Sequence, residues 1–103
     1  MVLYNVTINV DDNLHDEWLE WMLTIHIPMV MDTGMFISYK MFRLVSRIPE
    51  ETGTTYSVQY FLDNMDKFDL YRTVYAPDLQ QETIIRFGDL VGITAFRTVL
   101  EEV

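Results

Sequence analysis

The chain has 103 residues, a formal net charge of -9 at pH 7 and no cysteine. Its length predicts a single domain over residues 1–103, and its acidity argues against nucleic acid or a membrane surface as a partner, because phosphate groups are bound by clustered Lys and Arg. The absence of cysteine excludes a disulfide framework and a thiol nucleophile, and it fits the reducing cytoplasm, where we expect the protein to reside.

The first half of the chain predicts a strand followed by a helix. Apolar and polar residues alternate over 2–10, which is typical of a strand with one buried face. Acidic and amide side chains at 11–13 are suited to cap a helix. The apolar residues with helical spacing that should pack on the sheet are Leu14, Trp18, Trp21, Met22, Ile25 and Met29. Because Pro28 disturbs a helix, we expect a break near His26 and a last turn that stops at Gly34.

The second half predicts two strands, a helix and a final strand. The predicted strands are Met35 to Arg47, 54–62 and Val91 to Leu100. Asp63 or Asn64 should cap the second helix, which Pro77 should kink or divide. The apolar stripe of that helix consists of Met65, Phe68, Tyr71, Tyr75 and Leu79. The segment 87–89 should close the helix, since it contains a glycine.

The order of these patterns is β-α-β-β-α-β. A four-stranded antiparallel sheet with two helices on one face is the short, unknotted way to bury such elements. The expected fold class is therefore α+β and ferredoxin-like. This fold hosts many unrelated functions, so it does not by itself define a reaction.

The face of the sheet away from the helices is expected to be partly apolar. The strand predicted over 35–47 carries large apolar side chains on both sides, so either side would leave some of them uncovered. Because closed two-fold dimers dominate soluble oligomers, we expect this face to pair with the same face of a second copy. Polar residues within 5–9 and 57–59 should lie there, either as a hydrogen-bonded seam or as the polar part of a ligand pocket.

Candidate chemistry centres on His26. At the predicted end of the first helix its imidazole could act as an acid or base, or it could bond a carbonyl freed by Pro28 in a structural role. His15 lies roughly 16 Å away along a helix, too far to share a metal ion, and we expect no metal site. The candidate ligand-binding residues are Asn5, Thr7, Asn9, Tyr39, Ser57, Gln59 and Arg97. The sequence contains no nucleophile elbow and no phosphate loop, so nucleophilic hydrolysis and nucleotide chemistry are not expected. No cofactor is expected either.

Several separated motifs give the chain a family resemblance. They are Trp18-x-x-Trp21-Met22, His26-Ile27-Pro28, Thr54-Thr55-Tyr56, Ala76-Pro77-x-Leu79-Gln80-Gln81, Arg86-Phe87-Gly88-Asp89 and Phe96-Arg97-Thr98. With these motifs the chain resembles a family of short bacterial proteins described as a domain of unknown function. More distantly it resembles the dimeric α/β-barrel superfamily, which includes antibiotic-biosynthesis-type monooxygenases, muconolactone-isomerase-like enzymes and haem-using peroxidases. That resemblance implies sheets paired in a dimer and ligands placed between sheet and helices.

Three functions remain open from the sequence. The first is a cytoplasmic homodimer that binds a small apolar ligand between sheet and helices. The second is a cofactor-independent monooxygenase-like or isomerase-like enzyme, with His26 as acid or base and Asn5, Gln59 or Arg97 positioning a small organic substrate. The third is a protein-interaction module that uses a second apolar stripe on the first helix, made of Leu19, Leu23 and Val30.

Overall fold

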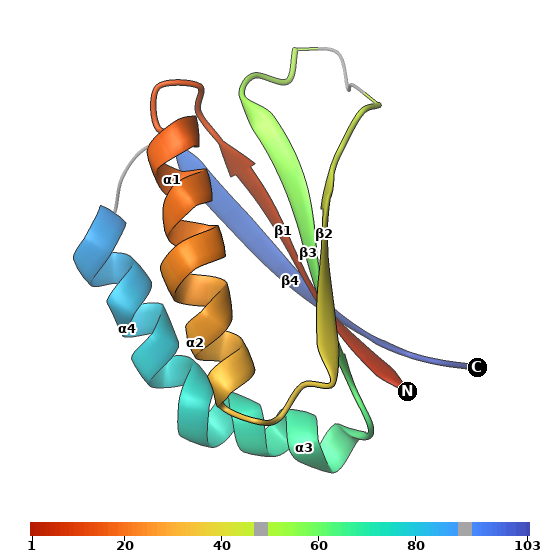
Figure 1. Cartoon of the computed structure of the whole chain (residues 1–103). Coiled ribbons are helices and arrows are strands. Elements are labelled where there is room, and N and C mark those ends of the chain that lie inside the picture. Colours follow the sequence, from red (N-terminus) through yellow and green to blue (C-terminus); the bar gives the residue numbers. More distant parts are fainter. Residues whose placement is uncertain (47–49, 89–91) are drawn as a thin grey trace.

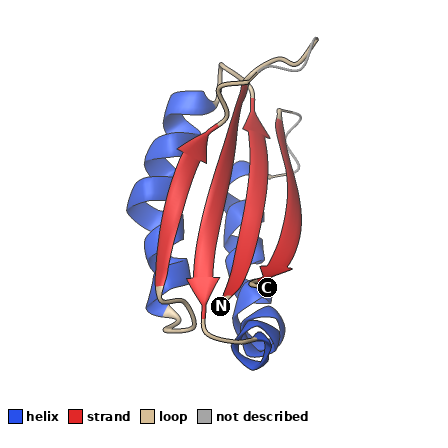
Figure 2. Cartoon of the chain, turned by 90° about the vertical axis from the view of Figure 1, so that its right-hand side faces the viewer, coloured by secondary structure: helices blue, strands red, loops and turns tan. Residues whose placement is uncertain are grey.

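The computed structural model describes residues 1–46, 50–88 and 92–103. Their strands form one antiparallel sheet in the order β2-β3-β1-β4 (Figure 1). Figure 2 shows the sheet in front and the helices together behind it, so the other face of the sheet is uncovered. The expected ferredoxin-like α+β fold is therefore confirmed. The strands are β1 (Val2–Val10), β2 (Ser38–Arg43), β3 (Thr54–Leu62) and β4 (Ile93–Glu101).

Each of the two helical segments contains a turn of π-helix between two stretches of α-helix. The first segment consists of α1 (His15–Trp21), η1 (Met22–His26) and α2 (Ile27–Asp32). The second consists of α3 (Met65–Leu70), η2 (Tyr71–Tyr75) and α4 (Ala76–Phe87). Asn64 caps the second segment as expected, because its side chain accepts a hydrogen bond from the backbone N–H of Lys67 at 3.0 Å. Gly88 ends it with a φ of 67°.

The expected break near His26 is wrong, because the helix continues through Pro28. The backbone N–H of Ile27 donates to the carbonyl of Met22, five residues earlier, which widens the turn just before the proline. A wider turn moves apart the groups that a proline ring would otherwise crowd, and Pro28 then lies in the first turn of α2. The same arrangement recurs before Pro77, where the N–H of Ala76 donates to the carbonyl of Tyr71.

The π-turn also changes which face of the first helix is buried. A π-turn inserts one residue, so positions after it rotate relative to a regular α-helical stripe. Ile27 and Val30 are buried, whereas Ile25 and Met29, which were expected on the sheet, are 49% and 38% exposed. The exposed stripe expected for a protein partner is also wrong, since Val30 lies in the core.

Strand β2 is shorter than expected at both ends. It begins at Ser38 rather than Met35, because the preceding Phe36 turns into the core. The Phe36 ring lies 5.1 Å from that of Tyr60 and 4.7 Å from that of Tyr71, between centroids. These aromatic contacts bury the Phe36 ring between the sheet and the second helical segment. The expected last residue of this strand, Arg47, and the expected first residue of the final strand, Val91, lie outside the described residues.

Candidate functional site

The pairing register of the strands sorts the expected site residues onto the two faces of the sheet. Paired residues of antiparallel strands project to the same side. Arg97 pairs with Val6, and Tyr39 pairs with Tyr60, so both lie on the side that faces the helices. The open face carries the other five expected residues, which are Asn5, Thr7, Asn9, Ser57 and Gln59.

This division corrects one expectation. Asn5 and Gln59 lie across the sheet from the helix that carries His26, so neither positions a substrate for its imidazole. The register brings Arg97, but not the amides, to the side of His26. The two sets of residues therefore belong to opposite faces of the sheet.

The polar residues of the open face hydrogen-bond with one another. Ser57 donates to Oδ1 of Asn5 at 2.6 Å, and the Asn5 amide donates to the hydroxyls of Thr7 at 3.0 Å and Thr98 at 3.3 Å. Gln59 donates to Ser57 at 3.3 Å. These groups satisfy one another within one chain, as in a polar seam between apolar side chains. The largest exposed apolar groups around the seam are Phe42, Phe96 and Leu100.

A small cavity lies on the other side of the sheet, between it and both helical segments. Its volume is about 90 Å³, and most of its lining is apolar or aromatic. The first segment contributes Met22 and His26 from its π-turn, and the second contributes Tyr71 from its own. Both π-turns therefore contribute residues to the cavity, and π-turns are frequent at functional sites. The polar or ionisable lining residues are Tyr4, His26, Tyr60, Tyr71, Gln80, Thr83 and Arg97.

His26 is the cavity-lining residue, among those described, that carries a buried side-chain polar atom without a hydrogen-bond partner. Its ring stacks on Trp21 at a centroid distance of 4.8 Å, with an interplanar angle of 20°. Among the described residues its buried Nδ1 atom finds no hydrogen-bond partner, so the alternative structural bond to a freed carbonyl is not made by this atom. Burial, reinforced by the charge of Arg97, lowers the pKa of His26 to about 4. The imidazole is therefore neutral at pH 7.

The depressed pKa of His26 predicts a pH-dependent stability. In the unfolded chain the histidine has its ordinary pKa of about 6.5, so as the pH falls the unfolded chain binds the proton before the folded protein does. The contribution of His26 to the free energy of unfolding is therefore complete above pH ~6.5 and is lost toward pH ~4. Between pH ~7.5 and pH ~5.5 the free energy of unfolding should fall by about 1 kcal/mol from this group. Urea unfolding over that range measures it. His26→Asn should remove this loss, and His15→Asn, at the other histidine, should retain it.

The other ionisable groups make the cavity rich in hydrogen-bond donors. Burial raises the pKa of Tyr60 and Tyr71, and it also raises that of Tyr4, where the positive charge of Arg97 acts in the opposite direction. All three phenols therefore keep their protons at neutral pH. No carboxylate is among the cavity-lining residues that the structure describes. Tyr39, which was expected in the site, is not part of this lining.

The sequence signal for Tyr4 and Tyr71 was available but weak. Tyr4 stands at an inward position of the alternating strand, and Tyr71 stands on the apolar stripe of the second helix. A phenol at such a position carries a polar group into the core, where it needs a partner or a cavity. Only the three-dimensional structure shows that these hydroxyl-bearing residues line a common cavity.

His15 has a different environment from His26. Its Nε2 lies 2.6 Å from the hydroxyl of Tyr56, and its Nδ1 lies 2.9 Å from a carboxylate oxygen of Asp16. Tyr56 is buried, so this contact satisfies its hydroxyl group. His15 is not among the residues lining the cavity. Its role in the described structure is to support the packing of α1 on β3.

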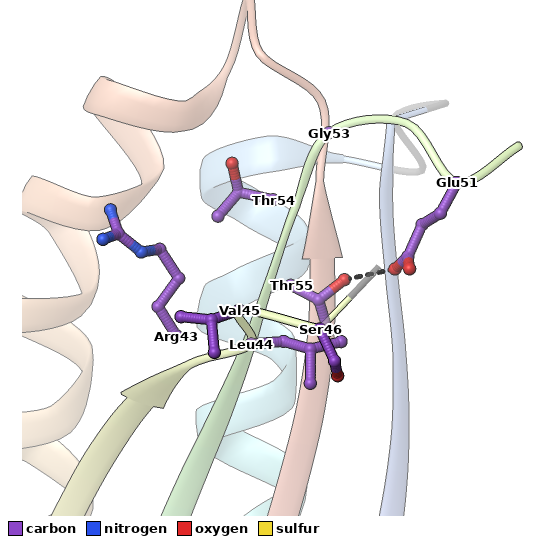
Figure 3. Close-up of a pocket in the computed structure, with 8 residues that line it drawn as sticks. All are labelled: Arg43, Leu44, Val45, Ser46, Glu51, Gly53, Thr54 and Thr55. Carbon is purple, nitrogen blue, oxygen red and sulfur yellow. Dashed lines mark hydrogen bonds between the residues drawn. The ribbon is translucent and has the colours of Figure 1, made fainter. Parts of the chain in front are cut away.

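A wider opening lies at the end of the β2–β3 hairpin (Figure 3). Its volume is about 280 Å³, and it is lined by residues 43–46, 51 and 53–55. Within it the Thr55 hydroxyl donates to Glu51 at 2.6 Å, which Figure 3 shows as a dashed line. Residues 47–49, which connect these segments in the sequence, lie outside the described part of the chain. We therefore assign no site to this opening.

The sequence matches the family described as "Domain of unknown function (DUF4286)" over residues 1–103. The protein belongs to this family. The resemblance read from the sequence motifs is thus confirmed, and the DUF4286 assignment covers both the strands and the helices that surround the cavity. None of the curated protein sequences matches the chain closely enough to count as a relative.

Solved structures of similar fold extend the comparison. An ethyl tert-butyl ether D (EthD) family protein from Bacillus halodurans has 16% identity, full coverage of both chains and a TM-score of 0.67. A putative antibiotic biosynthesis monooxygenase from Deinococcus radiodurans has 13% identity, coverage of 99% of this chain and 92% of that chain, and a TM-score of 0.63. A dimeric ferredoxin-like protein of unknown function from Thermobifida fusca has 17% identity, coverage of 97% and 92%, and a TM-score of 0.57. At these identities the similarity shows the fold of this DUF4286 protein.

Proposed function

We propose that this protein binds a small organic ligand in the cavity between the sheet and the helices. The observation that carries the proposal is the buried Nδ1 atom of His26, which lacks a partner among the described residues and belongs to a cavity-lining side chain. An unpaired buried polar atom is costly, and a ligand that bonds it would recover that cost. The mostly apolar lining with a few polar groups is the usual form of a small-molecule site.

An enzyme of the cofactor-independent monooxygenase or isomerase type is the second candidate. It is supported by the structural similarity to the Deinococcus radiodurans protein, whose description is a putative antibiotic biosynthesis monooxygenase. In that role His26 would contact the substrate. A pKa of about 4 makes its imidazole a weak base at pH 7, so a hydrogen-bonding role for His26 is favoured over proton abstraction. Ligand binding is therefore favoured over catalysis.

We also propose that the protein is a single-domain, cytoplasmic homodimer of bacterial origin, paired through the open face of the sheet. Partly exposed phenylalanines on that face support the pairing, as does the description of the Thermobifida fusca structure as dimeric. Asn5, Thr7, Asn9, Ser57 and Gln59 would then form a polar seam of the interface. Among the described residues, no helix combines the length and apolar character needed to cross a membrane.

Filling the cavity tests the ligand proposal. Ala95 lies on β4 and lines the cavity, so Ala95→Phe should occupy its space. Small organic fragments can be screened by ¹H–¹⁵N NMR. Fragments that bind in the cavity should shift the amide signals of residues 95, 80 and 83 in the parent protein. In Ala95→Phe these shifts should fall at least about tenfold, because the bound fragment and the new ring compete for one volume.

Val99→Phe is the matched control for that substitution. Val99 is on the same strand and the same side of the sheet, opposite Tyr4, but it does not line the cavity. This variant should retain the fragment-induced shifts. Fragments that perturb other surfaces only, or that bind both variants equally, would refute the cavity as the site.

A further inference from the structure

We propose that the ligand of this cavity is a small monocarboxylate, held by Arg97 through its carboxylate, with its short hydrocarbon part between the sheet and the helices. The proposal rests on the ligand cavity proposed above and specifies the chemical class that it takes. The charge, the hydrogen-bonding groups and the size of the cavity all favour such a ligand.

Arg97 is the only lining residue, among those described, that is charged at neutral pH. The chain has sixteen Asp and Glu residues, yet none of those that the structure describes lines the cavity. Arg97 also takes no part in the ion pairs between described residues, whereas Arg72 pairs with Asp69 and Arg86 pairs with Glu17. An arginine that faces a cavity without a carboxylate partner is suited to bind a carboxylate from outside, because its planar guanidinium matches that group in two hydrogen bonds.

The uncharged polar groups of the lining also favour an anion. Tyr4, Tyr60 and Tyr71 carry their hydroxyl protons at neutral pH, as phenols ordinarily do, and burial raises the pKa of each further. Protonated phenols can donate to a carboxylate oxygen, and an anion accepts several such bonds at once. A cationic ligand would find no opposite charge in this lining and would be repelled by Arg97.

The volume of the cavity limits the ligand to a few atoms. A buried cavity of about 150 Å³ accommodates benzene, so about 90 Å³ accommodates roughly four non-hydrogen atoms. Arg97 is exposed on the edge strand β4, so the carboxylate can lie toward the rim while the apolar part enters. The three carbon atoms of propionate fit this space while its two carboxylate oxygens lie toward the rim, whereas the ring of an aromatic acid exceeds it.

The test is an NMR titration of the intact protein with sodium propionate and, separately, with propionamide. Propionamide is neutral and has the same number of non-hydrogen atoms. Propionate should shift the amides of Ala95, Arg97 and Gln80 with a millimolar dissociation constant, and propionamide should bind about tenfold more weakly because it lacks the charge-assisted bonds. Arg97→Gln should abolish the difference between the probes.

Arg72→Gln is the control, because it removes the same charge from an exposed position outside the cavity. It should retain the preference for propionate. Equal affinity of the parent protein for both probes, no binding of either probe, or a preference that persists in Arg97→Gln would overturn the carboxylate assignment. Cavity-directed binding of neutral fragments that Ala95→Phe removes would still support the proposed ligand site, so the two proposals fail separately.

Discussion

Replacing Phe96 with Asp is expected to convert the proposed homodimer into a monomer. Phe96 is 62% exposed and lies on the open face opposite Thr7, next to the polar seam. In a paired-sheet dimer its ring would be buried, and a carboxylate at the same place would lose its hydration without gaining a cation. The dissociation constant should rise on the order of 100-fold or more. Native mass spectrometry at micromolar concentration, supported by light scattering, reports the subunit number.

Val74→Asp provides the control for this result. Val74 is 54% exposed in η2, on the helical layer rather than the open face, so a new carboxylate there stays in solvent. This variant should remain dimeric. A parent protein that is monomeric at every concentration, or a dimer that survives Phe96→Asp, would rule out the pairing through this face.

Gly53→Ala is expected to cause the largest loss of folding stability among the substitutions considered. Gly53 precedes β3 and has a φ of 76°, which an L side chain rarely adopts. A Cβ atom built there would lie directly against the backbone carbonyl of Val10, which is fixed in the sheet next to β3. The two effects together should lower the free energy of unfolding by about 3 kcal/mol or more. Urea denaturation monitored by tryptophan fluorescence measures this loss.

Gly34→Ala separates the two causes of that loss. Gly34 has nearly the same φ, 77°, but a Cβ atom built there meets nothing within 4 Å. This variant should lose only the backbone term, about 1 kcal/mol. If both glycine variants are equally destabilised, the contact with Val10 has no energetic role and the hairpin entry tolerates a side chain.

The alternating and helical patterns were sufficient to predict the fold. In β1 and β3 the side chains at successive positions point to opposite faces, so a buried face imposes a period of two on the sequence. The Asn64 cap and the Gly88 terminator were likewise visible, because each acts on its own neighbouring backbone groups. Such local interactions leave local sequence signals.

The helical faces could not be predicted as well. A proline indicates a disturbed helix, but either a break or a π-turn relieves the same clash, and the choice depends on packing against the sheet. The π-turn buries Ile27 and Val30 in place of Ile25 and Met29. A buried face predicted from the constant period of an α-helix is wrong beyond a π-turn, because the π-turn changes that period.

The composition of the candidate site depended on the tertiary structure for a related reason. His26 and Arg97 were recognisable as chemically interesting, but they are far apart in sequence, and only packing brings them to one cavity. The strand register then placed Asn5 and Gln59 on the opposite face, because a shift of one residue along a strand reverses the direction of its side chain. The sequence by itself determined the order of the elements, the expected fold and the acidic character of the chain, since these follow from local periodicity and composition. The tertiary structure decided which polar groups share a site, since that depends on long-range pairing and on how a helix accommodates its proline.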